Sequence, residues 1–292
     1  MYKRILVITG SQPWIDASVE YAIALAASTG ADLSLLTVPL PPIVAGMPDG
    51  TACSAIALES VVAQSETVLA GITAAAEQAG VSYTTRVRWG NTAAMILHTA
   101  AEEDCDLIIV GSYAPTWRSR WLLSHIIKKV TASARQPLLV VTAPPKESYD
   151  SIAWSRLLVV HDGSPSGEAS VHYGLALAQE ASLDVCLLHV NALRQHDAVD
   201  SFSGTQHGQD ILTLAASQAA IAGTNHDVVL ASGNIVTDIV ETAAAKACGV
   251  IVLGVAPYSG WQRLVYRHTV KAVLASTALP LLLLNRSVTY WH

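Results

Sequence analysis

The sequence RILVITGSQPWIDASVEYAIALAASTGADLSLLTV at residues 4–38 recurs without a gap as RLLVVHDGSPSGEASVHYGLALAQEASLDVCLLHV at residues 156–190. Fifteen of these 35 aligned positions are identical. Residues 90–142 match residues 233–285 in the same way, with 18 of 53 positions identical. The chain of 292 residues is therefore a tandem duplication, and we expect one domain over residues 1–145 and a second over residues 155–292.

Each repeat alternates short apolar runs with longer stretches rich in Ala and Leu. Runs such as Ile5–Ile8 and Leu157–Val160 have the pattern of strands that are covered on both faces. The stretches that follow them, residues 17–28 and 169–180, favour helices. Five strands and four helices per repeat predict two doubly wound α/β domains, each on a five-stranded parallel sheet. In such sheets ligands bind beyond the carboxyl ends of the strands, where the strand order reverses.

The connection after the second strand differs between the repeats. In the first repeat, residues 54–78 predict a long Ala-rich helix. In the second repeat, residues 191–210 are polar and predict a loop, either a lid over the sheet edge or a weakly ordered segment. We expect the matching helix only from residue 211 to residue 222.

Composition and charge exclude several classes of protein. Hydrophobic residues make up 51% of the chain and charged residues 14%, which excludes long disordered stretches. The net charge is −6 and there is no block of Lys and Arg, so we expect no nucleic-acid partner. No run reaches the roughly 18 apolar residues of a membrane span, and the first residues read as a strand rather than a signal peptide. Four widely spaced cysteines favour a reducing, cytoplasmic location.

Polar residues follow the first strand of each repeat. The second repeat reads HDGS at residues 161–164, where the first repeat reads TGSQ at residues 9–12. The Asp162 carboxylate could accept hydrogen bonds from a ribose or from an adenine amino group. An Asp-Gly pair is equally typical of a plain turn, so both interpretations of Asp162 stay open. Gly10, at the matching position of the first repeat, offers no acid.

The order and spacing of these blocks resemble the universal stress protein family. The blocks are a strand followed by Asp-Gly-Ser and a helix, LLHV at residues 187–190, and a strand–Gly–loop–helix–Pro–strand unit that ends each repeat. The resemblance implies an adenine-nucleotide α-hydrolase-like fold, a role in stress survival and dimer contacts through the last strand of each domain. In a tandem chain, residues 138–141 and 281–284 would make those contacts as an intramolecular pseudo-dimer, with a homodimer as a further expectation.

Nucleotide-binding members of that family carry Gly-x-x-Gly, nine residues and then Gly-Ser or Gly-Thr. The backbone amides of such a loop and of the following helix hold phosphates. The first repeat keeps the first glycine as Gly111, but Ala114 stands at the second and Ser124-His125 at the closing pair. His125 near a helix start suggests a grip on some other anion, or simply a solvated basic residue.

The second repeat departs from the pattern as well. Gly254 remains, but Pro257 removes an N–H donor and Arg267-His268 replaces the closing pair. Bulky side chains then stand where the backbone would approach a phosphate, at what we expect to be the start of a helix. ATP is the cofactor that the resemblance implies. These departures argue against a standard ATP cradle in both repeats, and more so in the first, where the acid is also absent.

We therefore expect a non-enzymatic stress-response module that binds a small ligand or acts as a scaffold. A nucleotide-binding switch or a nucleotide hydrolase in the second repeat stays open as the alternative. We assign no catalytic residue and no metal ligand, because no closely spaced ligand motif is present. The candidate ligand-binding residues of the second repeat are His161, Asp162, Gly163, Val190, Leu253, Gly254, Arg267 and His268. The weaker candidates of the first repeat are Thr9, Gly10, Val38, Val110, Gly111, Ser124 and His125.

Overall fold

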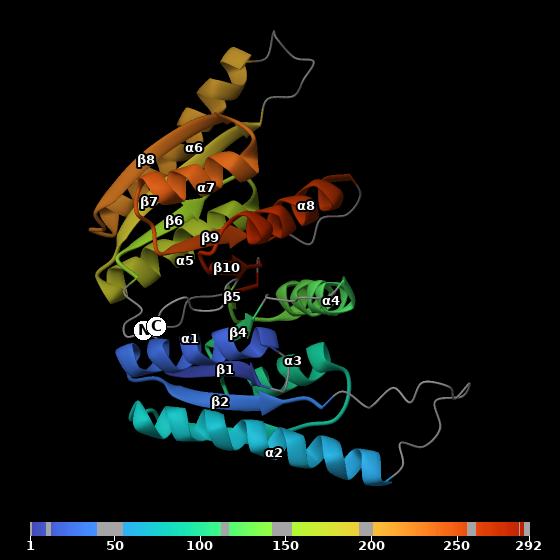
Figure 1. Cartoon of the computed structure of the whole chain (residues 1–292). Helices are drawn as coiled ribbons and strands as arrows, with labels where there is room; N and C mark the ends of the chain where they lie inside the picture. Colours follow the sequence, from blue (N-terminus) through green and yellow to red (C-terminus); the bar gives the residue numbers. More distant parts are fainter. Residues whose placement is uncertain are drawn as a thin grey trace. The chain divides into compact units, whose positions relative to one another are not determined.

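The computed structural model describes residues 2–9, 13–39, 55–111, 117–141, 154–192, 201–255, 261–285 and 287–288 (Figure 1). Within these ranges strands and helices alternate in each repeat, as the sequence predicts. The first repeat consists of β1 (Arg4–Thr9), α1 (Pro13–Thr29), β2 (Asp32–Thr37), α2 (Ala55–Gln78), β3 (Tyr83–Val87), α3 (Thr92–Glu102), β4 (Leu107–Gly111), α4 (Trp117–Ser133) and β5 (Leu138–Val141). The second consists of β6 (Arg156–Val160), α5 (Pro165–Ala181), β7 (Asp184–Ala192), α6 (Ser201–Ile221), β8 (His226–Gly233), α7 (Ile235–Ala245), β9 (Val250–Gly254), α8 (Trp261–Ser276) and β10 (Leu281–Leu284).

The chain forms two compact units whose border does not follow the border between the repeats. Residues 2–126 belong to the first unit, whereas residues 127–143 and 153–292 belong to the second. The first unit holds four parallel strands in the order β3-β2-β1-β4. Strands β1 and β4, which are apolar over residues 5–8 and 107–110, are buried along nearly their whole length, as expected for strands covered on both faces.

The second unit holds the five parallel strands of its own repeat in the order β10-β9-β6-β7-β8. Right-handed crossovers place α5 and α6 on one face of this sheet and α7 and α8 on the other (Figure 1). Strand β5 of the first repeat joins the same sheet antiparallel to β10, with Leu139 opposite Leu282. The last strands of the two repeats therefore pair in the antiparallel sense that the sequence predicts.

The loop predicted at residues 191–210 is wrong in most of its length. Strand β7 continues to Ala192, and helix α6 begins at Ser201 rather than at residue 211. The polar segment SFSGTQHGQD carries no apolar period, so it gives no helical signal by itself. Gly208 lets this part of α6 lie close to β7, since a Cβ there would come within 2.8 Å of His189 Cδ2.

Two asparagines at equivalent positions begin helices in the two repeats. Asn91 Oδ1 accepts a hydrogen bond from Ala94 N at 3.1 Å ahead of α3. Asn234 Oδ1 accepts from Val236 N at 2.9 Å ahead of α7. Each side chain satisfies amides that the helix itself leaves without a partner. No helix in the described parts of the chain has both the length and the apolar character required to cross a membrane.

Candidate functional site

The turn after β6 is built by Asp162 and Ser164. Asp162 Oδ1 accepts hydrogen bonds from Ser164 N at 3.0 Å and from Ser164 Oγ at 2.5 Å. Ser164 Oγ accepts from Gly167 N at 3.1 Å and so caps α5, which begins with Pro165. Gly163 has a φ of 79°, a conformation that suits glycine. Asp162 thus has the local role typical of an Asp-Gly turn, and its role in ligand binding stays a prediction.

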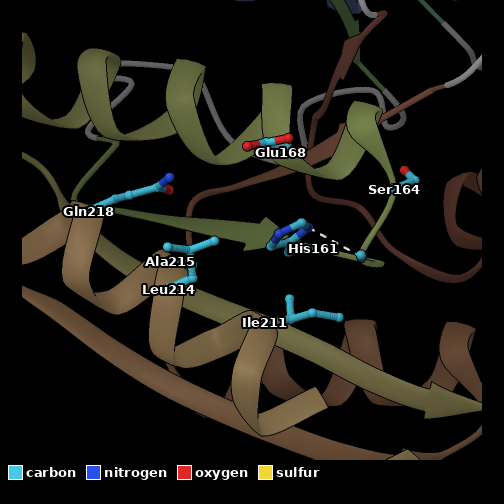
Figure 2. Close-up of a pocket in the computed structure, with 8 residues that line it drawn as sticks. His161, Ser164, Glu168, Ile211, Leu214, Ala215 and Gln218 are labelled. Carbon is cyan, nitrogen blue, oxygen red and sulfur yellow. Dashed lines mark hydrogen bonds between the residues drawn. The ribbon is translucent and has the colours of Figure 1, made fainter. Parts of the chain in front are cut away.

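A pocket of about 150 Å³ lies beside this turn, between α5 and α6 (Figure 2). An engineered cavity of about this size holds a benzene molecule, whereas pockets for drug-sized ligands span roughly 300–1,000 Å³. The volume therefore suits a ligand of one ring rather than a whole nucleotide. The pocket is lined by His161, Gly163, Ser164, Glu168, Ile211, Leu214, Ala215 and Gln218.

His161 is the buried polar group of this pocket, with 8% of its surface exposed. Its Nδ1 accepts a hydrogen bond from Gly163 N at 3.3 Å, so the neutral ring carries its proton on Nε2. Burial lowers the pKa of His161, against the opposing effect of the nearby Asp162 carboxylate. In Figure 2 the bonded edge of the ring faces the turn and the other edge faces the α6 side of the pocket. The pocket is therefore offered an imidazole N–H donor at neutral pH.

His189 on β7 fixes the backbone of His161 from the neighbouring strand. Its Nδ1 donates to the His161 carbonyl oxygen at 2.6 Å, and its Nε2 lies 3.2 Å from Asn191 Oδ1. If the Asn191 amide turns its NH₂ toward the ring, a neutral His189 is satisfied at both nitrogens. The same orientation gives a partner to the buried Asn191 Nδ2, which otherwise has none among the described residues. His189, 6% exposed, is thus a support of the site.

Glu168 and Gln218 supply the remaining polar groups of the pocket that project from helices. Figure 2 shows Glu168 on α5 and Gln218 on α6, with His161 on the strand between those helices. Glu168 Oε1 lies 4.0 Å from His172 Nε2 on the same helix. Among the lining residues that the structure describes, none is Lys or Arg. This described lining therefore carries negative charge at neutral pH, which repels a triphosphate.

Gly254 marks the point between β9 and β6 where the strand order reverses. A Cβ on Gly254 would lie 2.0 Å from Ser166 O and 2.7 Å from Ser170 Oγ, so the strand end packs directly against α5. Leu253 is buried beside it, and Val190 at the end of β7 is half-buried. Packing alone thus requires a glycine at this position. Pro257 lies outside the described residues.

The expectation that the basic pairs lie at helix starts is wrong in both repeats. Helix α4 begins at Trp117 and α8 at Trp261, so Ser124-His125 and Arg267-His268 lie well inside helices. Beyond the first turn, backbone amides bond within the helix and cannot hold an anion. Residues that continue a helix stand where the family loop has glycine, which extends both helices toward their N-termini. The side chains at 267 and 268 lie outside the described part, while those of Ser124 and His125 are exposed on α4.

The matching sheet edge of the first repeat is closed by two threonines. Thr9 Oγ1 and Thr37 Oγ1 lie 2.7 Å apart, and each residue is 2% exposed. The other candidates that the structure describes here, Val38, Val110 and Gly111, are all buried. Gly10 lies outside the described residues. The described strand ends of the first repeat therefore present no pocket-lining polar group comparable to His161.

The apolar wall of the pocket and Glu168 were missed by sequence reasoning. Ile211, Leu214, Ala215 and Gln218 recur at the spacing of one helical face, which is a recognisable signal. What the sequence does not reveal is that this face of α6 meets the first turn of α5.

The described residues also bear on the enzymatic and metal alternatives. Ser164 Oγ bonds to Asp162 and His161 Nδ1 accepts from Gly163 N, so these two atoms are bonded elsewhere rather than to each other. Within the described ranges, no group of three or more His, Cys, Asp or Glu residues is placed to hold a metal ion. The described cysteines, Cys105, Cys186 and Cys248, are buried free thiols.

Comparison with known proteins matches both repeats to one family. The model of the universal stress protein family matches residues 1–142 and again residues 153–285. A universal stress protein of Methanocaldococcus jannaschii is 30% identical over 149 residues, which is 50% of this chain and 86% of that protein. A solved universal stress protein from Archaeoglobus fulgidus DSM 4304 has a TM-score of 0.72 at 16% identity, over 97% of this chain and 96% of its own. A functionally unknown protein from Pseudomonas aeruginosa PAO1 has a TM-score of 0.63 at 16% identity, over 97% and 92% of the two chains.

Proposed function

The chain belongs to the universal stress protein family, and from this premise we propose that it is a non-enzymatic module whose second repeat binds a small ligand in the α5–α6 pocket. One observation carries the proposal. The buried imidazole of His161 lines a ring-sized pocket, together with the Gln218 amide and the exposed Glu168 carboxylate. The Nε2–H edge of His161 faces the pocket, where an acceptor on a ligand would bond to it.

The lining defines the chemical class of that ligand. His161 Nε2–H donates to an acceptor on the ligand, and the Glu168 carboxylate accepts from a donor on it. The Gln218 amide can bond to either kind of group. Ile211, Leu214 and Ala215 provide an apolar wall for the body of the molecule. The ligand is therefore a neutral molecule of about one ring that carries both an acceptor and a donor, such as a primary carboxamide.

ATP fits this pocket poorly. The pocket volume is about 150 Å³, its lining is negative, and the loop departures leave no standard phosphate cradle in the sequence. We expect calorimetric titration with MgATP to show a Kd no tighter than about 100 μM, on the order of −5.5 kcal/mol. Micromolar affinity would contradict this part of the proposal.

A matched pair of probes tests the site directly. Benzamide offers an acceptor and a donor, whereas benzoate has the same ring and shape but is an anion. We expect benzamide to bind with a Kd of about 1 mM, as is usual for a fragment of its size, and benzoate at least tenfold more weakly. NMR titration of the ¹⁵N-labelled protein reports both the affinity and the location, through the amides of Gly163 and Ser164.

Variants separate the pocket from the rest of the surface. His161→Phe keeps a ring but removes the donor, and should weaken benzamide at least fivefold. His125→Gln on the exposed face of α4 is the control and should leave the affinity unchanged. Benzamide shifts that map to residues outside the α5–α6 pocket would refute the site. Native mass spectrometry of freshly purified protein then identifies any ligand that the pocket retains.

A further inference from the structure

We propose that His161 couples the α5–α6 pocket to pH: on acidification the protonated ring leaves its buried position, enters the pocket and displaces the ligand. The ligand part of this inference rests on the proposed function of the pocket. The movement of the ring rests on the geometry of the turn alone.

The buried edge of the His161 ring accepts protonation only at a structural cost. In the neutral ring Nδ1 accepts from Gly163 N at 3.3 Å. A proton on Nδ1 would face that N–H, so two donors would oppose each other and the hydrogen bond within the turn would be lost. The first turn of α5 leaves no room for adjustment on this side, since a Cβ on Gly167 would come within 2.6 Å of Nδ1.

The direction of the movement follows from what holds the residue. The His161 carbonyl oxygen is fixed by His189 Nδ1 at 2.6 Å, so the backbone stays in place and the side chain must turn. The turn and α5 close one edge of the ring, and the pocket lies at the other (Figure 2). Because burying a charged imidazole costs free energy, the ring moves into the more open space that a ligand would occupy.

The charged and titratable groups around His161 have opposing effects on its pKa. Asp162 and Glu168 favour its protonated form, whereas His189 and His172 disfavour it. His207 on α6 lies near the turn, with its Nε2 3.8 Å from the position of a Cβ on Gly163. Burial outweighs the two carboxylates and lowers the pKa of His161 below its usual value near 6.5. The neutral ring thus contributes stability that is fully present above pH 6.5 and is lost as the pH falls through the lowered pKa.

The first repeat contains a natural control. Thr9 and Thr37 occupy the positions of His161 and His189 at the same offset of 152 residues, and hydroxyls do not titrate in this range. Acidification from pH 7.5 to pH 5 should therefore alter the strand ends of the second repeat and leave those of the first unchanged.

The test follows the His161 ring and benzamide binding in one NMR titration of the whole protein. At pH 7.5 we expect Nε2 of His161 to be protonated and Nδ1 to be bare. Between pH 7.5 and pH 5 the Gly163 and Ser164 amides should shift with the His161 midpoint, and benzamide affinity should fall at least threefold. His161→Gln offers an acceptor and a donor but no titrating group, and should reduce the pH effect to less than twofold.

Two control variants separate His161 from its neighbours. His172→Gln and His207→Gln should keep the full pH effect, and loss of the effect in either would overturn the assignment to His161. Benzamide affinity that is equal at both pH values in the wild-type protein would refute the coupling while leaving the proposed function intact. Absence of benzamide binding at both values contradicts the proposed function instead, and the Gly163 and Ser164 shifts then decide whether the ring moves.

Discussion

The two repeats place different side chains at the same two strand ends. In the first, Thr9 and Thr37 bond to each other through their side chains and close the edge. In the second, His189 bonds to the backbone of His161, so the His161 ring is left for the pocket. Both pairs are buried and satisfy a polar group of the neighbouring strand. The difference teaches that exchanges at two duplicated positions can turn a closed strand end into a lining for a ligand.

The ion pairs at the opposite edge of the sheet also differ between the two repeats. Arg156 bonds to Asp184 at 2.8 Å and to Asp227 at 3.1 Å. Lys246 forms a second ion pair with Asp227. In the first repeat the equivalent Arg4 lies 3.7 Å from Asp32. The second repeat thus joins three strands and the end of a helix through one arginine, opposite the edge that carries the pocket.

The largest expected effect is at Gly254, where the second repeat packs most closely. Gly254→Ala places a Cβ 2.0 Å from Ser166 O, so β9 and α5 must separate. We expect the free energy of unfolding of the second unit to fall by about 3 kcal/mol or more, measured by hydrogen exchange.

Gly71→Ala on α2 is the control. A Cβ there meets nothing within 4 Å, so it should stabilise the first unit by up to about 1 kcal/mol. Wild-type protection in Gly254→Ala would contradict the packing.

A double-mutant cycle at Thr9 and Thr37 tests whether their hydroxyls only bond to each other and close this strand end. Thr9→Val leaves the buried Thr37 hydroxyl without its 2.7 Å partner and should cost the first unit about 1–2 kcal/mol. Thr9→Val combined with Thr37→Val removes both hydroxyls at nearly constant shape and should cost less than the single change. Hydrogen exchange of the β1 and β2 amides measures both. A double variant that is worse than the sum of the two single changes would indicate a further role for these hydroxyls.

The smallest expected effect is at the arginines of the opposite edge. Arg156→Met breaks contacts to two carboxylates, whereas Arg4→Met breaks one longer ion pair and a bond to the Glu103 carbonyl. We expect Arg156→Met to lower the thermal midpoint of its unit by more than Arg4→Met lowers that of the first. The difference should shrink in 1 M NaCl, because salt screens such partly exposed pairs. Equal losses, or a difference that salt leaves unchanged, would argue against a charge effect.

The sequence predicts what depends on local pattern and fails where tertiary contact decides. Strands such as β1 and β9 are runs of apolar residues, and the internal duplication tests each prediction twice. The start of α6 was missed because residues 201–210 carry no apolar period and gain helical structure partly by packing on β7. The turn at Asp162 could be predicted from its Asp-Gly pair. Its meeting with Ile211 could not, because nothing in either segment encodes the approach of α5 and α6.

The antiparallel pair of β5 and β10 has a consequence for the order in which the chain is made. Val140 pairs with Leu281, which is synthesised about 140 residues later. At ribosomal rates of roughly 5–20 residues per second, this delay lasts about 7–28 s. During that time the sequence Leu138-Leu139-Val140-Val141 has no strand to pair with on that side and is open to chaperones or to a neighbouring nascent chain. The tandem arrangement therefore confers intramolecular pairing at the expense of a long exposed interval during synthesis.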